Sequence, residues 1–304
     1  MTATTQAPHD AATRPLDVGA AVLIVFLCLC WGFNQVAVKL ALPEIPPLVQ
    51  ATTRNIGAAL IIWAYARARG ISLDMRDATV KAGIVAGILF ALEFIFIYRG
   101  LVYTTVSRAV LFIYCAPFVV VIGSHFLIQG DRFRLSQWLG LFMSFAGIAL
   151  AFGVPGPAAD PNQLFGDVFL LLGGIAWGLT TLVVKATSLA RIAPEKTLQY
   201  QLLFSIPLLG AVSWFLGERM TQLPGQVALW SLAYQTIWVV AITFLLWFMM
   251  IVRYSASRLS SFTFLTPLFG VFAGYVVMGD PITPGFAAAV ALVIGGLVLV
   301  NRPK

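Results

Sequence analysis

The sequence predicts an all-α membrane protein with ten transmembrane helices, arranged as two inverted five-helix repeats with both termini in the cytoplasm. Three observations predict this fold. The 304-residue chain is 60% hydrophobic and only 10% charged, so its outer surface suits lipid better than water. Its apolar residues form ten runs of roughly 17–23 residues, the length that crosses a bilayer as a helix. Two motifs occur twice each, which indicates an internal duplication.

The predicted spans are joined by short loops. They lie at about residues 18–38, 45–65, 80–99, 107–128, 136–153, 166–186, 197–216, 228–250, 256–278 and 284–301. The segment 154–165 holds three prolines and no Lys or Arg, which favours a linker between two halves. We therefore expect a cytoplasmic tail at 1–17 and five-helix repeats at 18–153 and 166–301.

The first repeated motif contains a proline inside an apolar run. Ser107-Arg108 precedes Pro117 by the same spacing as Ser257-Arg258 precedes Pro267, 150 residues later. Because five spans reverse the direction of the chain, the second copy enters the membrane from the opposite side. Inverted repeats of this kind are typical of secondary transporters, whose substrate site lies at the repeat interface near the membrane midplane.

Basic residues predict the orientation. With the N-terminus inside, 14 Lys and Arg residues fall on the cytoplasmic side and four on the outer side. The net charge of +7 does not indicate nucleic-acid binding, because these residues occur one to four at a time in short loops and form no stripe. The expected location is the bacterial cytoplasmic membrane.

The sequence offers no pattern for a cofactor or for enzyme chemistry. Cys28, Cys30 and Cys115 lie within apolar runs without a nearby His, so neither a disulfide framework nor a metal site is expected. The chain has no phosphate-binding Gly-x-x-x-x-Gly-Lys-Ser/Thr loop, and its spans contain no catalytic cluster. We expect no cofactor, and we expect that the protein is not an enzyme.

The second repeated motif carries a family resemblance. Trp31-Gly32 with Lys39 returns as Trp177-Gly178 with Lys185, 146 residues later. Together with the Ser-Arg…Pro spans, this resembles the EamA-like branch of the drug/metabolite transporter superfamily, and within it the YddG-type aromatic amino-acid exporters. The resemblance implies a central cavity lined by spans 1, 3, 4, 6, 8 and 9, supporting spans 5 and 10, and alternating access without ATP. Family members often carry Gly-Glu after spans 4 and 9, where this chain has Gly-Asp.

Several residues could form the transport pathway. Pro117 and Pro267 each remove a helix hydrogen bond near mid-span, so each forms either a gating kink or a kink that only shapes packing. Trp31 and Gln35 lie one turn apart, as do Trp177 and Thr181, and each pair offers a ring and a polar group to a solute. The alternative for both tryptophans is a position at the bilayer interface.

Glu93 is the acid that lies well inside a predicted span. A charged carboxylate at membrane depth costs about 2.5 kcal/mol or more, so we expect a function for it. It could carry a proton or pair with a substrate amine, or it could be a structural partner for Arg54 or a nearby hydroxyl. An aromatic cage is expected from residues of spans 3, 4, 8 and 9, each of which could equally be ordinary core or lipid-facing residues: Tyr98, Tyr114, Tyr234, Trp238 and Phe264.

The expected function is transport of small metabolites across the cytoplasmic membrane by alternating access. The favoured cargo and direction are export of amino acids, aromatic ones in particular. The alternative cargo is a cationic or aromatic drug, since an aromatic cavity with one acid also fits a flat cation. The expected partners are a small-molecule substrate and the lipid bilayer. Residue patterns leave open whether the protein is a monomer or a homodimer.

Overall fold

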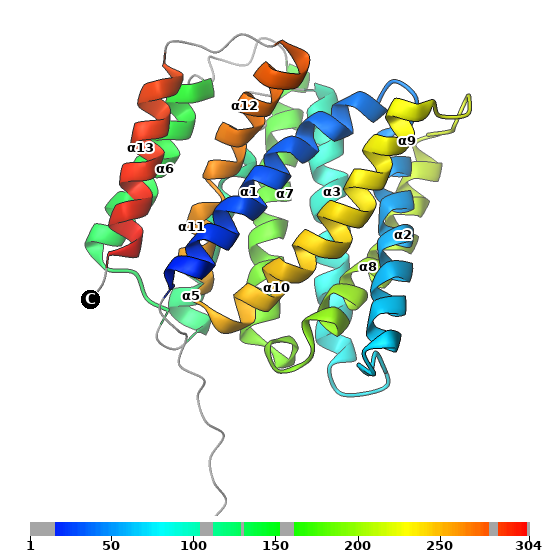
Figure 1. Cartoon of the computed structure of the whole chain (residues 1–304), viewed down its shortest axis with the longest axis horizontal. Helices are drawn as coiled ribbons and strands as arrows, with labels where there is room; N and C mark the ends of the chain where they lie inside the picture. Colours follow the sequence, from blue (N-terminus) through cyan, green and yellow to red (C-terminus); the bar gives the residue numbers. More distant parts are fainter. Residues whose placement is uncertain (1–15, 104–111, 129–130, 153–160, 280–284, 303–304) are drawn as a thin grey trace, which may run out of the picture.

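The computed structural model describes residues 16–103, 112–128, 131–152, 161–279 and 285–302. These residues form a bundle of helices (Figure 1). The helices are α1 (Val18–Ala41), α2 (Pro47–Ala68), α3 (Val80–Tyr103), α5 (Ala116–Leu127), α6 (Leu135–Phe152), α7 (Pro161–Ala186), η1 (Ser188–Arg191), α8 (Pro194–Phe215), α9 (Gln226–Ala233), η2 (Tyr234–Thr243), α10 (Phe244–Arg253), α11 (Ala256–Phe262), α12 (Leu265–Met278) and α13 (Phe286–Asn301). Ser107, Arg108, Gly130 and Asp280 of the predicted motifs lie outside the described residues.

The helices are those of a membrane protein. Six helical stretches are long and apolar enough to cross a bilayer, and three further apolar helices are shorter. Large apolar side chains face outward, among them Phe126, Phe215 and Trp230, each more than 70% exposed. An apolar outer surface of this extent requires lipid around it, because a soluble protein would aggregate through it.

Local sequence explains several helix ends. Asp17 caps α1 by accepting a 2.8 Å hydrogen bond from the amide of Ala20. Prolines stand in the first turn of α2 and α8, where a missing amide hydrogen costs nothing. Helix α7 begins at Pro161, inside the segment predicted as a linker, so the predicted start at residue 166 was five residues too late. Proline at the first helical position favours this earlier start.

Helices α6 and α13 form a pair at one side of the bundle (Figure 1). Their glycines allow the two backbones to approach closely. A β-carbon at Gly140 would lie 2.5 Å from the carbonyl oxygen of Gly296, and one at Gly296 would lie 2.3 Å from Ser144 Oγ. The hydrophobic effect cannot drive two helices together in lipid. Close van der Waals packing through small residues holds such a pair together instead. The helices of the fifth and tenth predicted ranges therefore pack against each other.

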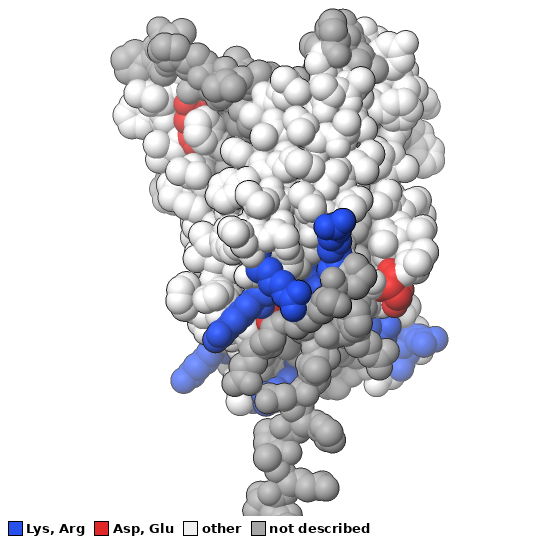
Figure 2. Space-filling model, turned by 90° about the vertical axis from the view of Figure 1, so that its left-hand side faces the viewer, with Lys and Arg blue, Asp and Glu red and all other residues white. Residues whose placement is uncertain are grey.

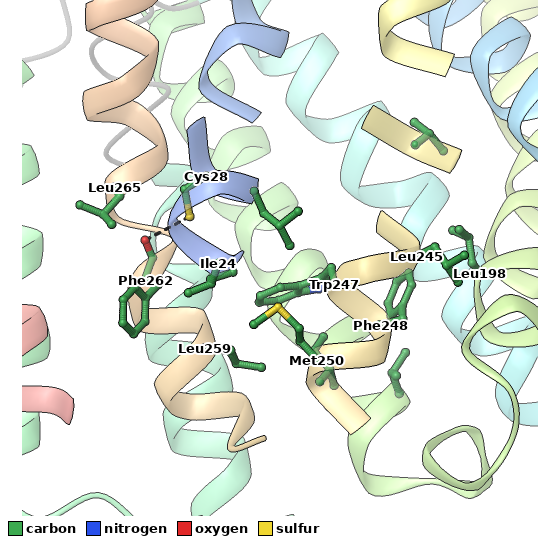
Figure 3. Packing of buried hydrophobic residues seen from close by; sticks show 14 of the residues in the cluster. Ile24, Cys28, Leu198, Leu245, Trp247, Phe248, Met250, Leu259, Phe262 and Leu265 are labelled. Atoms are coloured by element: carbon green, nitrogen blue, oxygen red, sulfur yellow. Dashed lines mark hydrogen bonds between the residues drawn. The ribbon is translucent and has the colours of Figure 1, made fainter. Parts of the chain in front are cut away.

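The main core draws on most of the helices, and Figure 3 shows the part of it that lies between α1, α10 and α11. Ile24 and Cys28 of α1 lie between Trp247 on one side and Phe262 on the other, and Cys28 Sγ lies 3.4 Å from the carbonyl oxygen of Phe262. All four side chains are less than 10% exposed. This cluster joins α1, near the start of the chain, to helices more than 200 residues later.

The two proline-containing segments are each interrupted just before the proline. Tyr114 and Cys115 form a turn ahead of Pro117, and Thr263 and Phe264 form one ahead of Pro267. The amide of Thr263 donates to the carbonyl of Ser260 at 3.1 Å, and Thr266 donates to Thr263 at 2.9 Å, so the interruption is tightened by i to i+3 bonds. The carbonyl of Thr263, which Pro267 would leave without a helix donor, is satisfied in this way.

Both glycines of the Trp-Gly motif lie where helices cross closely. A β-carbon at Gly32 of α1 would lie 2.7 Å from both the amide nitrogen of Gly270 and the Cβ of Phe269 in α12. One at Gly178 of α7 would lie 2.7 Å from the Cβ of Val119 in α5. Any larger residue at either glycine would push the two helices apart, so the motif requires glycine there.

Candidate functional site

A row of aromatic rings runs from α1 through α10 to α3. Trp31 contacts Phe244 with ring centroids 6.2 Å apart, Phe244 contacts Phe90 at 6.1 Å, Phe90 contacts Phe94 at 5.0 Å, and Phe94 contacts Tyr98 at 6.2 Å. The first three contacts are edge-to-face, the arrangement that ring quadrupoles favour. We call these five residues the aromatic row. It joins two of the predicted site residues, Trp31 and Tyr98.

Trp31 is held in a fixed orientation. Its indole Nε1 donates a 2.9 Å hydrogen bond to Thr243 Oγ1, and its ring meets Trp247 edge-to-face at 5.5 Å. Thr243 is fully buried, and its hydroxyl donates a 2.6 Å hydrogen bond to the carbonyl of Val239. The indole is therefore fixed at both its polar and its apolar edge.

Two charged side chains lie beside the aromatic row. Arg54 of α2 is only 1% exposed, and its guanidinium carbon lies 4.1 Å from the centroid of the Phe94 ring, a cation–π contact. Glu93 of α3 is half-buried and close enough to Arg54 to interact with it electrostatically, but it forms no ion pair with it. The structure thus shows no direct bond for the predicted structural pairing of Glu93 with Arg54.

Polar side chains continue along the buried face of α2. Gln50, one turn before Arg54, accepts a 3.1 Å hydrogen bond from Gln235 Nε2, and Asn55 donates one of 3.0 Å to Ser205 Oγ. Gln235 belongs to η2, a π-helical segment of ten residues. Such segments are rare and occur frequently at functional sites. Sequence reasoning missed Gln50 and Asn55 and considered Arg54 only as a partner of Glu93, although polar residues crowded into one apolar run were the available signal.

A second aromatic cluster lies around the interrupted helices. Tyr114 contacts Trp177 edge-to-face at 5.8 Å and Phe264 at 6.1 Å, and Phe264 contacts Phe118 at 6.4 Å. Thr181, predicted to pair with Trp177, is buried, and its hydroxyl donates a 3.2 Å hydrogen bond to the carbonyl of Trp177. The structure therefore brings Tyr114, Trp177 and Phe264 together, and the two buried prolines Pro117 and Pro267 follow this cluster in the chain.

The remaining predicted site residues lie elsewhere. Tyr234 donates a 3.1 Å hydrogen bond to the carbonyl of Cys30, and Trp238 Nε1 lies 3.3 Å from Cys30 Sγ. Both contacts tie the α9–η2 segment to α1, and Trp238 is 39% exposed. Gln35 is exposed whereas Trp31 is half-buried, so the two side chains do not share one environment. The expected single aromatic cage is thus divided into the aromatic row, the second cluster and this contact with α1.

Lysine and arginine side chains gather toward one end of the bundle, as Figure 2 shows for one face. Of the described residues, twelve lie at this end and three, Lys39, Arg99 and Arg219, lie toward the other. We call the first the basic end. It contains the loops after α2, α5, α7 and α10 and the end of α13.

Contacts at the basic end hold the segment around residues 251–257, and one set of them joins the two halves of the chain. Lys185 Nζ donates to the carbonyls of Ile251, Val252 and Tyr254 at 2.6, 3.1 and 3.0 Å, which satisfies the free end of α10. The buried carboxylate of Asp131 accepts bonds from the hydroxyl of Ser255 and the amide of Ser257. We call these the basic-end contacts. Lys39, the motif counterpart of Lys185, is exposed and forms no hydrogen bond with any described residue.

Apolar helices around charged and aromatic side chains define the class of protein: a multi-pass membrane protein of transporter type. The EamA-like transporter family matches residues 18–153 and again residues 164–302, and the chain belongs to this family.

Relatives carry transporter names. The chain is 22% identical to the uncharacterized transporter YoaV of Bacillus subtilis over 91% of this chain and 94% of that one, and 26% identical to YvbV of the same organism over 92% and 91%. It is 20% identical to the uncharacterized inner membrane transporter YedA of Escherichia coli over 91% and 89%. A crystal structure with 21% identity superposes with a TM-score of 0.80 over 93% of this chain and 96% of the other, which shows a shared fold.

Proposed function

We propose that this protein is a secondary transporter of the bacterial cytoplasmic membrane that exports amino acids, aromatic ones in particular, by alternating access. The observation that carries the transport function is the family match, which occurs twice in one chain and leaves out only its ends and the segment 154–163. The aromatic row beside Arg54 and Glu93 supports an aromatic cargo, because rings stack on rings while charged groups hold a polar head.

The proposed architecture is ten spans in two inverted repeats. Helices occupy the predicted ranges in the described parts, and the contacts of the two Trp-Gly glycines support the duplication. Gly32 meets Phe269, Gly178 meets Val119, and Val119 and Phe269 are separated by the same 150 residues as the two prolines. Equivalent glycines thus cross equivalent positions, as a pseudo-two-fold relation between halves requires.

The proposed orientation places the basic end in the cytoplasm. Twelve basic residues against three agree with the rule that short cytoplasmic loops are rich in Lys and Arg. Among the basic-end contacts, those of Asp131 join the two halves there, while Lys39 near the opposite end is exposed. These features favour a conformation closed toward the cytoplasm.

A second candidate cargo is a flat organic cation. Glu93 is half-buried beside aromatic rings, and a carboxylate with aromatic neighbours suits a drug cation as well as an amino-acid ammonium. Arg54 argues against this alternative, because its buried positive charge repels a cation that has no carboxylate of its own.

Counterflow in proteoliposomes tests the proposal. Vesicles loaded with unlabelled solutes take up external labelled phenylalanine only if the protein exchanges both. Trans-stimulation by phenylalanine, tyrosine and tryptophan, but not by quaternary cations, is the expected result. Stimulation by cations alone would reject the amino-acid cargo and retain the transporter. A parallel series with a pH gradient measures whether protons drive net movement.

A further inference from the structure

Arg54 is a buried cation without a hydrogen-bond partner. Its side chain is 1% exposed, and neither Nε nor Nη2 finds an acceptor among protein atoms. The guanidinium carbon lies over the Phe94 ring, 4.1 Å from its centroid. The nearby acid, Glu93, interacts with Arg54 electrostatically but forms no ion pair with it.

The two unpartnered nitrogens form one edge of the guanidinium. The N–H bonds of Nε and Nη2 point in parallel, and this edge binds a carboxylate through two hydrogen bonds at once. The contact of the guanidinium carbon with the Phe94 ring uses no N–H group as a hydrogen-bond donor to an oxygen or nitrogen, so the Nε/Nη2 edge keeps both of its donors. Arg54 is therefore oriented as an arginine that receives a planar anion.

A purely structural role does not account for this arrangement. Burying a charge without a partner is among the most costly features that a membrane protein can carry, so intramembrane arginines usually pair with an anion or face a substrate pathway. Polar neighbours on the same helix have at least one partner each: Gln50 bonds to Gln235 and Asn55 bonds to Ser205, although Asn55 Oδ1 has none among protein atoms. Arg54 stands out among them because its bidentate edge is left unused.

We propose that Arg54 binds the carboxylate of the transported solute through its Nε/Nη2 edge, while Glu93 receives the ammonium group and Phe90, Phe94 and Tyr98 contact the side chain. This proposal rests on the proposed function and assigns it a specificity-determining residue. It identifies the ligand by chemistry, as a zwitterion with an aromatic side chain. Reaching this edge requires the protein to open further than it does here.

Three probes separate the two charges of the solute: phenylalanine with both, 3-phenylpropionate with only the carboxylate, and phenethylamine with only the ammonium. Binding of each to purified protein is measured by calorimetry. We expect Arg54→Lys to weaken phenylalanine and 3-phenylpropionate by about 10- to 100-fold, since a lysine cannot form the paired bonds, and to change phenethylamine less than about threefold.

Arg99→Lys is the matched control. Arg99 also lies over a ring, that of Tyr103 at 5.4 Å, but its Nη2 already donates to the Tyr103 hydroxyl at 2.8 Å. We expect Arg99→Lys to leave all three affinities unchanged. Glu93→Gln should show the opposite selectivity to Arg54→Lys, weakening phenethylamine and phenylalanine while sparing 3-phenylpropionate.

A measurement on the wild-type protein covers the case in which Arg54→Lys does not fold. Solid-state NMR detects the dipolar coupling between phenylalanine labelled with carbon-13 at its carboxylate and arginine labelled with nitrogen-15. A bidentate pair places these nuclei about 4 Å apart, so bound substrate should lose carboxylate signal through this coupling.

The results distinguish failure of the further inference from failure of the proposed function. If wild-type protein binds phenylalanine but Arg54→Lys binds it equally well, or if the NMR coupling is absent, Arg54 is not the carboxylate site. If wild-type protein binds 3-phenylpropionate but not phenylalanine, amino-acid transport is rejected while the role of Arg54 stands. If it binds neither carboxylate, the inference is overturned.

Discussion

At the scale of single residues, the membrane interior holds an acid and a base that are close but not bonded. Glu93 is half-buried and Arg54 is almost completely buried, so a proton or a solute reaches the acid more easily. The second half has Thr243, 150 residues later, in place of this acid. The hydroxyl of Thr243 accepts a hydrogen bond from the Trp31 indole. The acid is thus an asymmetric feature, and a role in coupling would belong to the first half alone.

Replacing this acid tests proton coupling. We expect Glu93→Gln to abolish the dependence of transport on a pH gradient, because an amide cannot carry a proton between the two sides. Arg54 and Tyr98, the charged and titratable neighbours that interact with this site, remain in the variant. Uptake of labelled phenylalanine with and without a gradient provides the measurement. An unchanged gradient dependence would remove Glu93 as the proton site.

A second residue-scale prediction concerns the loop between α2 and α3. Asp77 accepts bonds from Lys196 and from Thr79, and the lysine, as the largest cause, lowers the Asp77 pKa to about 2. Because the folded-state pKa lies below the ordinary value near 3.9, the stabilisation is present above that value and is lost as pH falls toward 2.

Asp77→Asn should therefore lower the unfolding temperature of the detergent-solubilised protein by a small amount at pH 5–7, and the difference from wild type should shrink below about pH 4 and disappear toward pH 2. Thermal unfolding at stepped pH measures it. A difference that instead grew at acid pH would mean that another group dominates the loop contact.

At the scale of secondary-structure elements, the interrupted helices are the features with the greatest freedom to bend. Both turns, at Tyr114–Cys115 and Thr263–Phe264, are next to the second aromatic cluster. A helix broken beside buried rings can change its angle while the two flanking segments keep their own hydrogen bonds. A gating role for these turns remains a prediction.

Pro267→Ala tests that role. Restoring a continuous helix should slow phenylalanine counterflow severalfold while changing folded yield little, since alanine favours the helix. Pro207→Ala is the matched control, because Pro207 also lies inside a helix, α8, but is exposed. Equal losses of transport and yield in Pro267→Ala would make the proline a structural element only.

The end of α10 provides another element-scale prediction. Lys185→Met removes a cation that bonds to three terminal carbonyls, and we expect about 1–3 kcal/mol of lost stability. Lys39→Met, at the exposed counterpart, should change stability by less than about 0.5 kcal/mol. Denaturation in detergent compares the two. Equal effects would show that the carbonyl contacts contribute little.

The sequence predicted the helices well because apolar run length is a physical requirement of the bilayer. The first helix begins at Val18 as predicted, and the fourth and ninth ranges contain the prolines that mark their interruptions. Run length does not specify which faces meet, so Tyr234 and Trp238 were grouped with a cage that they do not join. The π-helical η2 was not foreseen, since it depends on packing against α1 and α2.

At the scale of the whole molecule, the distribution of charge makes a prediction about orientation. Arg132 and Thr221 are exposed at opposite ends of the bundle. Each is replaced by cysteine, one at a time, in a background in which the three native cysteines are changed to serine. A membrane-impermeant maleimide applied to intact cells should label Thr221→Cys and not Arg132→Cys, because the basic end faces the cytoplasm. The reverse labelling would invert the proposed orientation.

The crossing of α1 and α12 at Gly32 and Gly270 has a mechanical consequence. The nearest atoms of α12 to Gly32 are backbone atoms and the Cβ of Phe269, whose position does not depend on a rotamer, so a small rotation requires no change of rotamer at this contact. Gly32 lies 14 residues after the first residue of α1, a lever arm of about 21 Å. A tilt of about 10° would displace the basic end of α1 by roughly 4 Å, more than the length of a hydrogen bond. Movements too small to disturb the glycine crossing are thus large enough to exchange contacts at the membrane surface.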